Sequence, residues 1–149
     1  MELIASIGGG PVALDTSIFI YFIEDHPRYR PLLKPLFAHI DDGGVAAVTS
    51  VLTLLETLVV PYRSGDRELA SKYEAILTNG RGLTVVPIAF SLVRLAAEIR
   101  AATSVRTADA LQLATAVSTR CSAFLTNDRR LAPVSGLKVL QLGDFASAS

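Results

Sequence analysis

The chain has 149 residues, a length that suits one domain with a hydrophobic core, and we expect a single domain over 1–149 with residues 1–10 as an N-terminal extension. Lys plus Arg and Asp plus Glu are balanced at 14 each, so the net charge gives no electrostatic argument for a nucleic-acid partner. A nucleic-acid partner would have to be attracted by positive charge concentrated in one part of the surface.

The apolar content is high, with half of the residues hydrophobic and a mean hydropathy of +0.43. No apolar run approaches the roughly 18 residues that a membrane-spanning helix needs, which argues against a membrane protein. Glu2 and the glycines at 8–10 make the first residues a poor signal peptide, so we expect a cytoplasmic protein. The single cysteine, Cys121, excludes an internal disulfide and a cysteine-based zinc site.

Residues 11–17 predict a buried strand, a tight turn and the start of a helix. The apolar run 12–14 is typical of a strand buried on both faces, and Thr16 and Ser17 are helix-capping types before the apolar run 18–23. Asp15 therefore follows the strand, where open α/β sheets place their ligands. The alternative is that Asp15 only caps the helix.

The rest of the chain continues to alternate between the two kinds of element. We predict further strands over 45–48, 83–86, 123–125 and 138–142, and helices over 28–40, 51–60, 66–78, 88–102 and 107–119. Such an alternation predicts an α/β fold, a three-layer α/β/α arrangement with a central parallel sheet.

Glu56 is the informative residue of the predicted helix 51–60. Its neighbours on a helical wheel are Leu52 and Val60, with Thr53 and Thr57 on the polar flank, so Glu56 should border the apolar face that meets the sheet. A carboxylate there needs a hydrogen-bond donor, a cation or exposure in a cleft. The alternative is a glutamate at the edge of the face that reaches water.

Two more acids, Asp109 and Asp128, lie near the start of a predicted helix or the end of a predicted strand, as Glu56 and Asp15 do. Asp109 falls in the first turn of a helix that Thr107 can cap, where a simpler account is a favourable charge against the helix dipole. Asp128 comes just after the predicted strand 123–125 and, like Asp15, stands beside a hydroxyl residue, Thr126.

In a parallel sheet, the carboxyl ends of the strands and the first turns of the following helices lie on one edge. We therefore predict that Asp15, Glu56, Asp109 and Asp128 share a site. Clustered carboxylates repel one another unless a cation intervenes, and oxygen-only ligands suit Mg²⁺ or Mn²⁺.

Together these motifs resemble the PIN-domain family of metal-dependent nucleases, and are most similar to the VapC-type toxins of bacterial toxin–antitoxin pairs. They are the Asp-Thr-Ser turn at 15–17, the Glu in the helix after Thr49-Ser50, the run Arg-Thr-Ala-Asp-Ala at 106–110 and the run Leu-Thr-Asn-Asp-Arg-Arg at 125–130. The resemblance implies that the four acids hold the metal and that Thr126 supports the site.

The resemblance also implies a function and partners. We expect a Mg²⁺-dependent endoribonuclease, the toxin of a type II pair, which hydrolyses RNA by metal-activated water, is neutralised by a small antitoxin and forms a homodimer. Arg106, Arg129 and Arg130 flank the acids and could contact RNA phosphates.

Two alternatives stay open. One is an aspartyl-phosphate hydrolase with Asp15 as nucleophile, which the serine at position 17 weakens because such enzymes carry a second Asp there. The other is a catalytically inactive PIN-like binding module.

Overall fold

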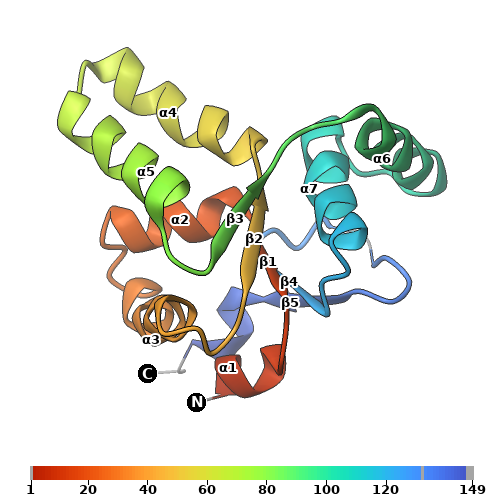
Figure 1. Cartoon of the computed structure of the whole chain (residues 1–149), viewed down its shortest axis with the longest axis horizontal. Coiled ribbons are helices and arrows are strands. Elements are labelled where there is room, and N and C mark those ends of the chain that lie inside the picture. The colour runs from red at the N-terminus through yellow and green to blue at the C-terminus, as the bar shows by residue number, and fades with distance from the viewer. Residues whose placement is uncertain (1, 132, 147–149) are drawn as a thin grey trace.

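The computed structural model describes residues 2–131 and 133–146, and its elements alternate as predicted (Figure 1). In chain order they are α1 (Glu2–Ile7), β1 (Val12–Leu14), α2 (Thr16–Ile23), α3 (Arg30–Asp41), β2 (Ala47–Ser50), α4 (Leu52–Ser64), α5 (Arg67–Asn79), β3 (Leu83–Val86), α6 (Phe90–Ala102), α7 (Thr107–Ser118), β4 (Ala123–Thr126), β5 (Lys138–Gln141) and the short 3₁₀ helix η1 (Leu142–Phe145). No helix within these described residues is both long and apolar enough to cross a membrane.

The five strands form one parallel sheet in the order β3-β2-β1-β4-β5, which confirms the predicted fold class. In the centre, Val12 of β1 lies between Ala47 of β2 and Ala123 of β4. The chain builds one half of the sheet outward from β1 to β3 and then returns to β4 on the other side. The point where the order reverses therefore lies between the carboxyl ends of β1 and β4, the place where such sheets bind ligands.

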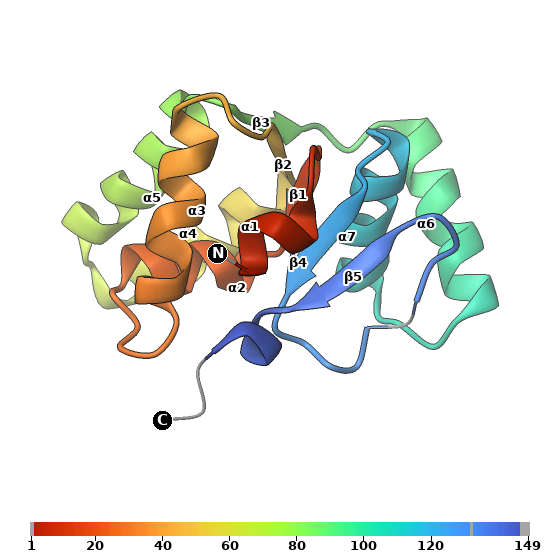
Figure 2. The same ribbon diagram turned by 90° about the horizontal axis from the view of Figure 1, so that it is seen from below.

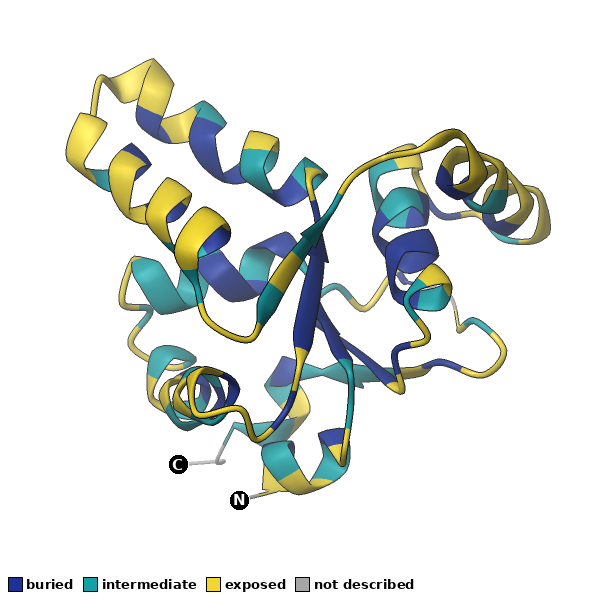
Figure 3. Cartoon of the chain, in the orientation of Figure 1, coloured by how far each residue is buried: buried dark blue, intermediate teal, exposed yellow. Residues whose placement is uncertain are grey.

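Successive side chains of a strand point to opposite sides, so each face of this sheet carries apolar side chains. Helices cover both faces. Val12 and Leu14 pack in one core with side chains of α1, α2, α3 and α5, whereas Ala13 and Phe124 pack in a second core with α6 and α7. Figure 3 shows the resulting pattern, with buried strands in the middle and exposed outer surfaces on α4, α5 and α6.

The N-terminal residues, for which we predicted only an extension, begin with helix α1. Leu3 and Ile7 are 0% and 2% exposed and belong to the same core as Val12 and Leu125. Seen from below, α1 lies against the sheet (Figure 2). Six residues give too short a periodic pattern to predict a helix, and its contacts with the core stabilise it instead.

The structure corrects two expectations about α4. The helix runs through Pro61 to Ser64, and Gly65, in the left-handed conformation at φ 72°, ends it. Its buried face also differs from the predicted one, since Thr53 and Thr57 are 0% and 2% exposed whereas Val60 is 66% exposed. The threonines tolerate burial because their hydroxyls all find hydrogen-bond partners.

The strand before α4 is also shifted. It covers Ala47–Ser50 rather than 45–48, so Thr49 lies within the strand instead of capping the helix. Thr49 Oγ1 donates to the Leu14 carbonyl at 2.8 Å, which ties β2 to the end of β1. Ser50 ends the strand, and its Oγ accepts a hydrogen bond at 3.1 Å from the backbone N–H of Leu52, the first residue of α4.

Candidate functional site

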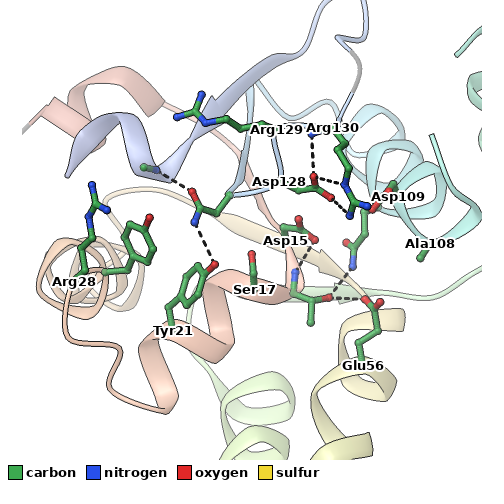
Figure 4. A pocket seen from close by; sticks show the side chains of 15 residues that line it. Asp15, Ser17, Tyr21, Arg28, Glu56, Ala108, Asp109, Asp128, Arg129 and Arg130 are labelled. Atoms are coloured by element: carbon green, nitrogen blue, oxygen red, sulfur yellow. Dashed lines mark hydrogen bonds and ion pairs between the residues drawn. The ribbon is translucent and has the colours of Figure 1, made fainter. Parts of the chain in front are cut away.

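A cavity of about 710 Å³ opens at the carboxyl edge of the sheet, and all four acids predicted to share a site line it (Figure 4). Asp15 follows β1, Glu56 comes from α4, Asp109 from the first turn of α7, and Asp128 from the loop after β4. The polar lining and the position at the switch point indicate a site for a charged ligand rather than an apolar one.

Asp15 both caps a helix and faces the cavity. Its Oδ1 accepts a hydrogen bond from the backbone N–H of Thr16 at 2.8 Å, so Asp15 is the N-cap of α2, the role that the sequence left open as an alternative. Its Oδ2 accepts a hydrogen bond from Thr126 Oγ1 at 2.6 Å. Burial, with smaller contributions from the charges of Asp109 and Glu56, raises the pKa of Asp15 despite these two hydrogen bonds.

Thr126, a fully buried residue at the end of β4, joins two of the acids. Its hydroxyl donates to Asp15 and accepts a hydrogen bond from the backbone N–H of Asp128 at 3.1 Å. Asp128 in turn receives two hydrogen bonds from the Arg130 guanidinium, at 3.0 Å to Oδ1 and 2.9 Å to Oδ2. The hydrogen bonding with Arg130 is the main reason that the pKa of Asp128 is lowered.

Glu56 is oriented by a network of buried hydroxyl and amide groups. Thr16 Oγ1 donates to Glu56 Oε1 at 2.6 Å. Behind this pair, the side-chain amide of Gln112 on α7 donates to Thr16 Oγ1 at 3.2 Å and to Thr53 Oγ1 at 3.0 Å. The network links α2, α4 and α7. Sequence reasoning missed Gln112, although a glutamine among apolar residues on the helix of Asp109 was a usable signal.

Asp109 reaches the cavity because of the packing of α7. The helix is the second of two between β3 and β4, so the rule that acids follow strands does not place it. Burial is the largest cause of the raised pKa of Asp109, followed by the charge of Asp128, while the charges of Arg130 and Arg106 oppose the shift.

The three arginines predicted to contact RNA differ in position. Arg129 and Arg130 line the cavity, whereas Arg106 is exposed before the first turn of α7 and is not part of the lining. Arg129 forms an ion pair with Asp144 of η1. The guanidinium groups of Arg129 and Arg130 thus lie at the edge of the acidic cavity.

Further lining residues come from α2, the loop before α3 and the loop after β4. Tyr21, Arg28, Tyr29 and Asn127 lie along the cavity from the acids, and we assigned none of them to a site from sequence. Ser17 also lines it, and its buried Oγ has no hydrogen-bond partner among the described residues. Asn127 had a detectable signal, because it sits between Thr126 and Asp128 in the loop after a buried strand.

The donor set fits a hard divalent cation. Every acidic group in the cavity offers oxygen, and the mutual repulsion that contributes to the raised pKa values of Asp15 and Asp109 is what a cation relieves. Among residues 2–131 and 133–146, no three His, Cys, Asp or Glu side chains form a ready ligand cluster. Mg²⁺ commonly binds through one or two carboxylates and keeps several waters, which suits an open arrangement of this kind.

Solved structures of other proteins share this fold. The fold is shared with VapBC2 from Rickettsia felis bound to a DNA fragment from its promoter, at 18% identity and a TM-score of 0.66 over 87% of this chain and 97% of that one. A toxin–antitoxin complex from Klebsiella pneumoniae is 20% identical with a TM-score of 0.62, covering 85% and 95% of the two chains. FitAcB from Neisseria gonorrhoeae is 18% identical with a TM-score of 0.61, covering 89% and 99%.

No curated protein sequence matches the chain. The PIN domain family matches residues 12–137, from the first residue of β1 to the residue before β5. Because this match spans most of the sequence and includes all four acids of the cavity, the chain belongs to the PIN domain family.

Proposed function

We propose that the protein is a divalent-metal-dependent endoribonuclease and acts in the cytoplasm as the toxin of a type II toxin–antitoxin pair. The observation that carries the proposal is the single cavity lined by Asp15, Glu56, Asp109 and Asp128 at the switch point of a PIN-domain sheet. When bound, Mg²⁺ or Mn²⁺ supplies positive charge for the transferring phosphate and lowers the pKa of a water.

The residues of the chain prepare the site for this chemistry. Asp15 is fixed by Thr126 and by the start of α2, and Thr16 fixes Glu56, so these two carboxylates need little rearrangement to act as ligands. We call the four carboxylates of the cavity the acidic wall, and Asp109 and Asp128 complete it. Arg129 and Arg130 at the edge supply donors for phosphate oxygens, which would hold an RNA strand without reading its sequence.

The partners of the proposal are an antitoxin and a second copy of the chain. Of the similar solved structures, one is VapBC2 bound to promoter DNA and another is a toxin–antitoxin complex, which supports an antitoxin partner. Large apolar side chains are also exposed on two helices, among them Leu55 and Val60 of α4 and Phe90 and Val93 of α6, at 60%, 66%, 85% and 47%. Exposed apolar groups of this size are typical of surfaces that a partner covers.

The test is cleavage of single-stranded RNA by the purified chain in the presence of Mg²⁺. We expect EDTA to abolish cleavage, Mg²⁺ or Mn²⁺ to restore it, and Asp15→Asn to reduce it to background, because the amide keeps the helix cap but offers a much weaker metal ligand. Asp42→Asn, in the exposed turn after α3, is the matched control and should retain activity. Cleavage that survives EDTA or Asp15→Asn would contradict the proposal.

The same preparations separate the two alternatives. A binding module would bind RNA and never cleave it under any metal condition. An aspartyl-phosphate hydrolase would release phosphate from a phosphomonoester. It would do so through a phosphorylated Asp15, which could be trapped. The serine at position 17, where such enzymes carry a second Asp, argues against Asp15 as a nucleophile.

A further inference from the structure

Three aromatic rings form a cluster, and two of them line the cavity. In Figure 4, Tyr21 of this cluster lies on the side of the cavity opposite Asp109. Ring centroids are 4.9 Å apart for Tyr21 and Tyr29, 5.0 Å for Tyr21 and His26, and 4.8 Å for His26 and Tyr29, the last pair nearly parallel at 24°. We call Tyr21, His26 and Tyr29 the aromatic cluster. Tyr21 and Tyr29 are half-buried and line the same cavity as the four acids.

Hydrogen bonds hold the aromatic cluster in a fixed place. The ring Nδ1 of His26 accepts hydrogen bonds from the backbone N–H groups of Arg28 and Tyr29, both at 3.2 Å, which orders the turn before α3. The Arg28 guanidinium carbon lies 5.5 Å from the centroid of the Tyr29 ring. Stacking of this kind keeps a positive charge beside the cluster.

A single side chain connects the aromatic cluster to the acidic wall. Asn127 donates from Nδ2 to the Tyr21 hydroxyl at 3.2 Å and accepts at Oδ1 from the backbone N–H of Gly143 at 3.0 Å. Asn127 immediately precedes Asp128, so the loop after β4 carries an acid of the cavity and also contacts the rings. Figure 4 shows Tyr21 and Arg28 on one side of the cavity and Asp109 and Arg130 on the other.

This arrangement combines the groups with which proteins bind nucleobases. Proteins bind the bases of single strands mainly by stacking them on aromatic side chains, and rings with polar tips and an adjacent amide can also form hydrogen bonds with base edges. Cleavage of a phosphodiester at the acidic wall makes no use of these rings. The cavity volume, about 710 Å³, is within the range of roughly 300–1,000 Å³ seen for ligand pockets and leaves room beyond the acids.

We propose that Tyr21 and Tyr29, with Arg28 and Asn127, form a subsite that stacks one unpaired nucleobase of single-stranded RNA beside the phosphate held at the acidic wall. This inference rests on the proposed ribonuclease function and adds to it a contact with one base of the substrate. Arg28 neutralises a neighbouring phosphate, and the subsite determines which nucleotide stands next to the cleaved bond.

The experiment measures binding, so that its outcome is separate from cleavage. The Asp15→Asn chain, which should not cleave, is titrated against fluorescent six-nucleotide single-stranded RNAs and against the same RNAs with one abasic position moved along the strand. We expect one abasic position to weaken binding about ten-fold, since stacking of one base on an aromatic residue is worth a factor of roughly 5 to 150. The other positions should have smaller effects.

Variants then connect that position to the aromatic cluster. Adding Tyr29→Leu, which keeps apolar bulk and removes the ring, should weaken binding of the intact RNA about ten-fold and remove the sensitivity to the abasic position. Tyr29→Phe, which keeps the ring, should preserve both. Tyr62→Ala removes a tyrosine of α4 that is 63% exposed and does not line the cavity, so it should behave like the parent.

Each result bears on one of the two proposals. Equal binding of all abasic RNAs, unchanged binding by Tyr29→Leu, or no measurable RNA binding would overturn the subsite, even if the native chain cleaves RNA. Coupling between Tyr29 and one base, together with a native chain that never cleaves RNA, would overturn the nuclease proposal and leave the subsite in place.

Discussion

At the scale of the residue, Asp15 shows that capping and a functional position are compatible. The sequence offered them as alternatives, yet one carboxylate oxygen caps α2 while the other accepts a hydrogen bond from Thr126 in the cavity. The charge on Asp15 nevertheless carries a cost, because burial and the neighbouring acids raise its pKa. This cost can be measured without knowledge of the substrate.

We predict that Asp15→Asn stabilises the metal-free protein near pH 7.5. Because the pKa of Asp15 is higher in the folded state, the folded state binds more protons between the ordinary value and the raised value, and stability falls as pH rises through that window. Asparagine avoids the penalty and still caps the helix. We expect the melting temperature to rise by a few degrees, since 1 kcal/mol corresponds to about 2–4 °C in a domain of this size.

The measurement is a series of thermal melts of both proteins in EDTA, from pH 7.5 down to pH 4. The gain should shrink as pH falls through the raised pKa, and adding Mg²⁺ should stabilise the native chain more than the variant. Asp42→Asn is again the control. A variant that is less stable than the native chain at pH 7.5 would contradict the prediction.

At the scale of the element, α4 buries the two threonines that its sequence pattern places on the polar flank of the helix. Thr53 shares a 2.7 Å hydrogen bond with Thr49 and accepts a hydrogen bond from Gln112, so its hydroxyl connects α4 to β2 and α7. Thr57, one turn later and equally buried, bonds only to carbonyls of its own helix, Thr53 at 2.8 Å and Leu54 at 3.2 Å. The two threonines are thus alike in burial and differ in whether their hydroxyls bond to other elements.

We predict that Thr53→Val is the more damaging of the two substitutions. Valine has nearly the same shape, but it removes an acceptor of the buried Gln112 amide, and a buried donor left unsatisfied costs about 1–3 kcal/mol. Thr57→Val removes a hydroxyl without leaving a side-chain partner unpaired and should cost less than about 1 kcal/mol.

Urea unfolding of the native chain and of both variants gives the comparison. An equal loss of stability in the two variants would show that the network around Gln112 contributes nothing beyond ordinary burial. Because Glu56 depends on Thr16 in the same network, Thr53→Val should also lower RNA cleavage, whereas Thr57→Val should not.

At the scale of the whole molecule, the two faces of the sheet are covered, but the outer surfaces of α4 and α6 are not. Phe90, at the start of α6, is 85% exposed, although an aromatic side chain of this size is normally covered. In Figure 1 these two helices extend on opposite sides of the edge strand β3. Self-association would cover such surfaces, as the homodimer proposal requires.

We predict that Phe90→Asp weakens self-association of the chain. A charge placed in an apolar contact has to be desolvated, which disfavours the dimer without affecting the core. Ser91→Asp adds the same charge at the next exposed position and is the control. Sedimentation velocity at micromolar concentrations should show a dimer for the native chain and for Ser91→Asp, and a larger monomer fraction for Phe90→Asp. A monomeric native chain would contradict the homodimer proposal.

The sequence by itself was sufficient for the parallel α/β fold and for the acids at strand ends, because these depend on local signals. Short apolar runs mark buried strands, and the edge at which parallel strands end is the same for Asp15 and Asp128. Tertiary packing decided the rest: the buried face of α4, the helix at residues 2–7, and the hydrogen bond between Tyr21 and Asn127 at the cavity. These features depend on contacts between residues that can be more than a hundred positions apart, such as Tyr21 and Asn127. The periodicity of a single segment carries no information about its distant partners.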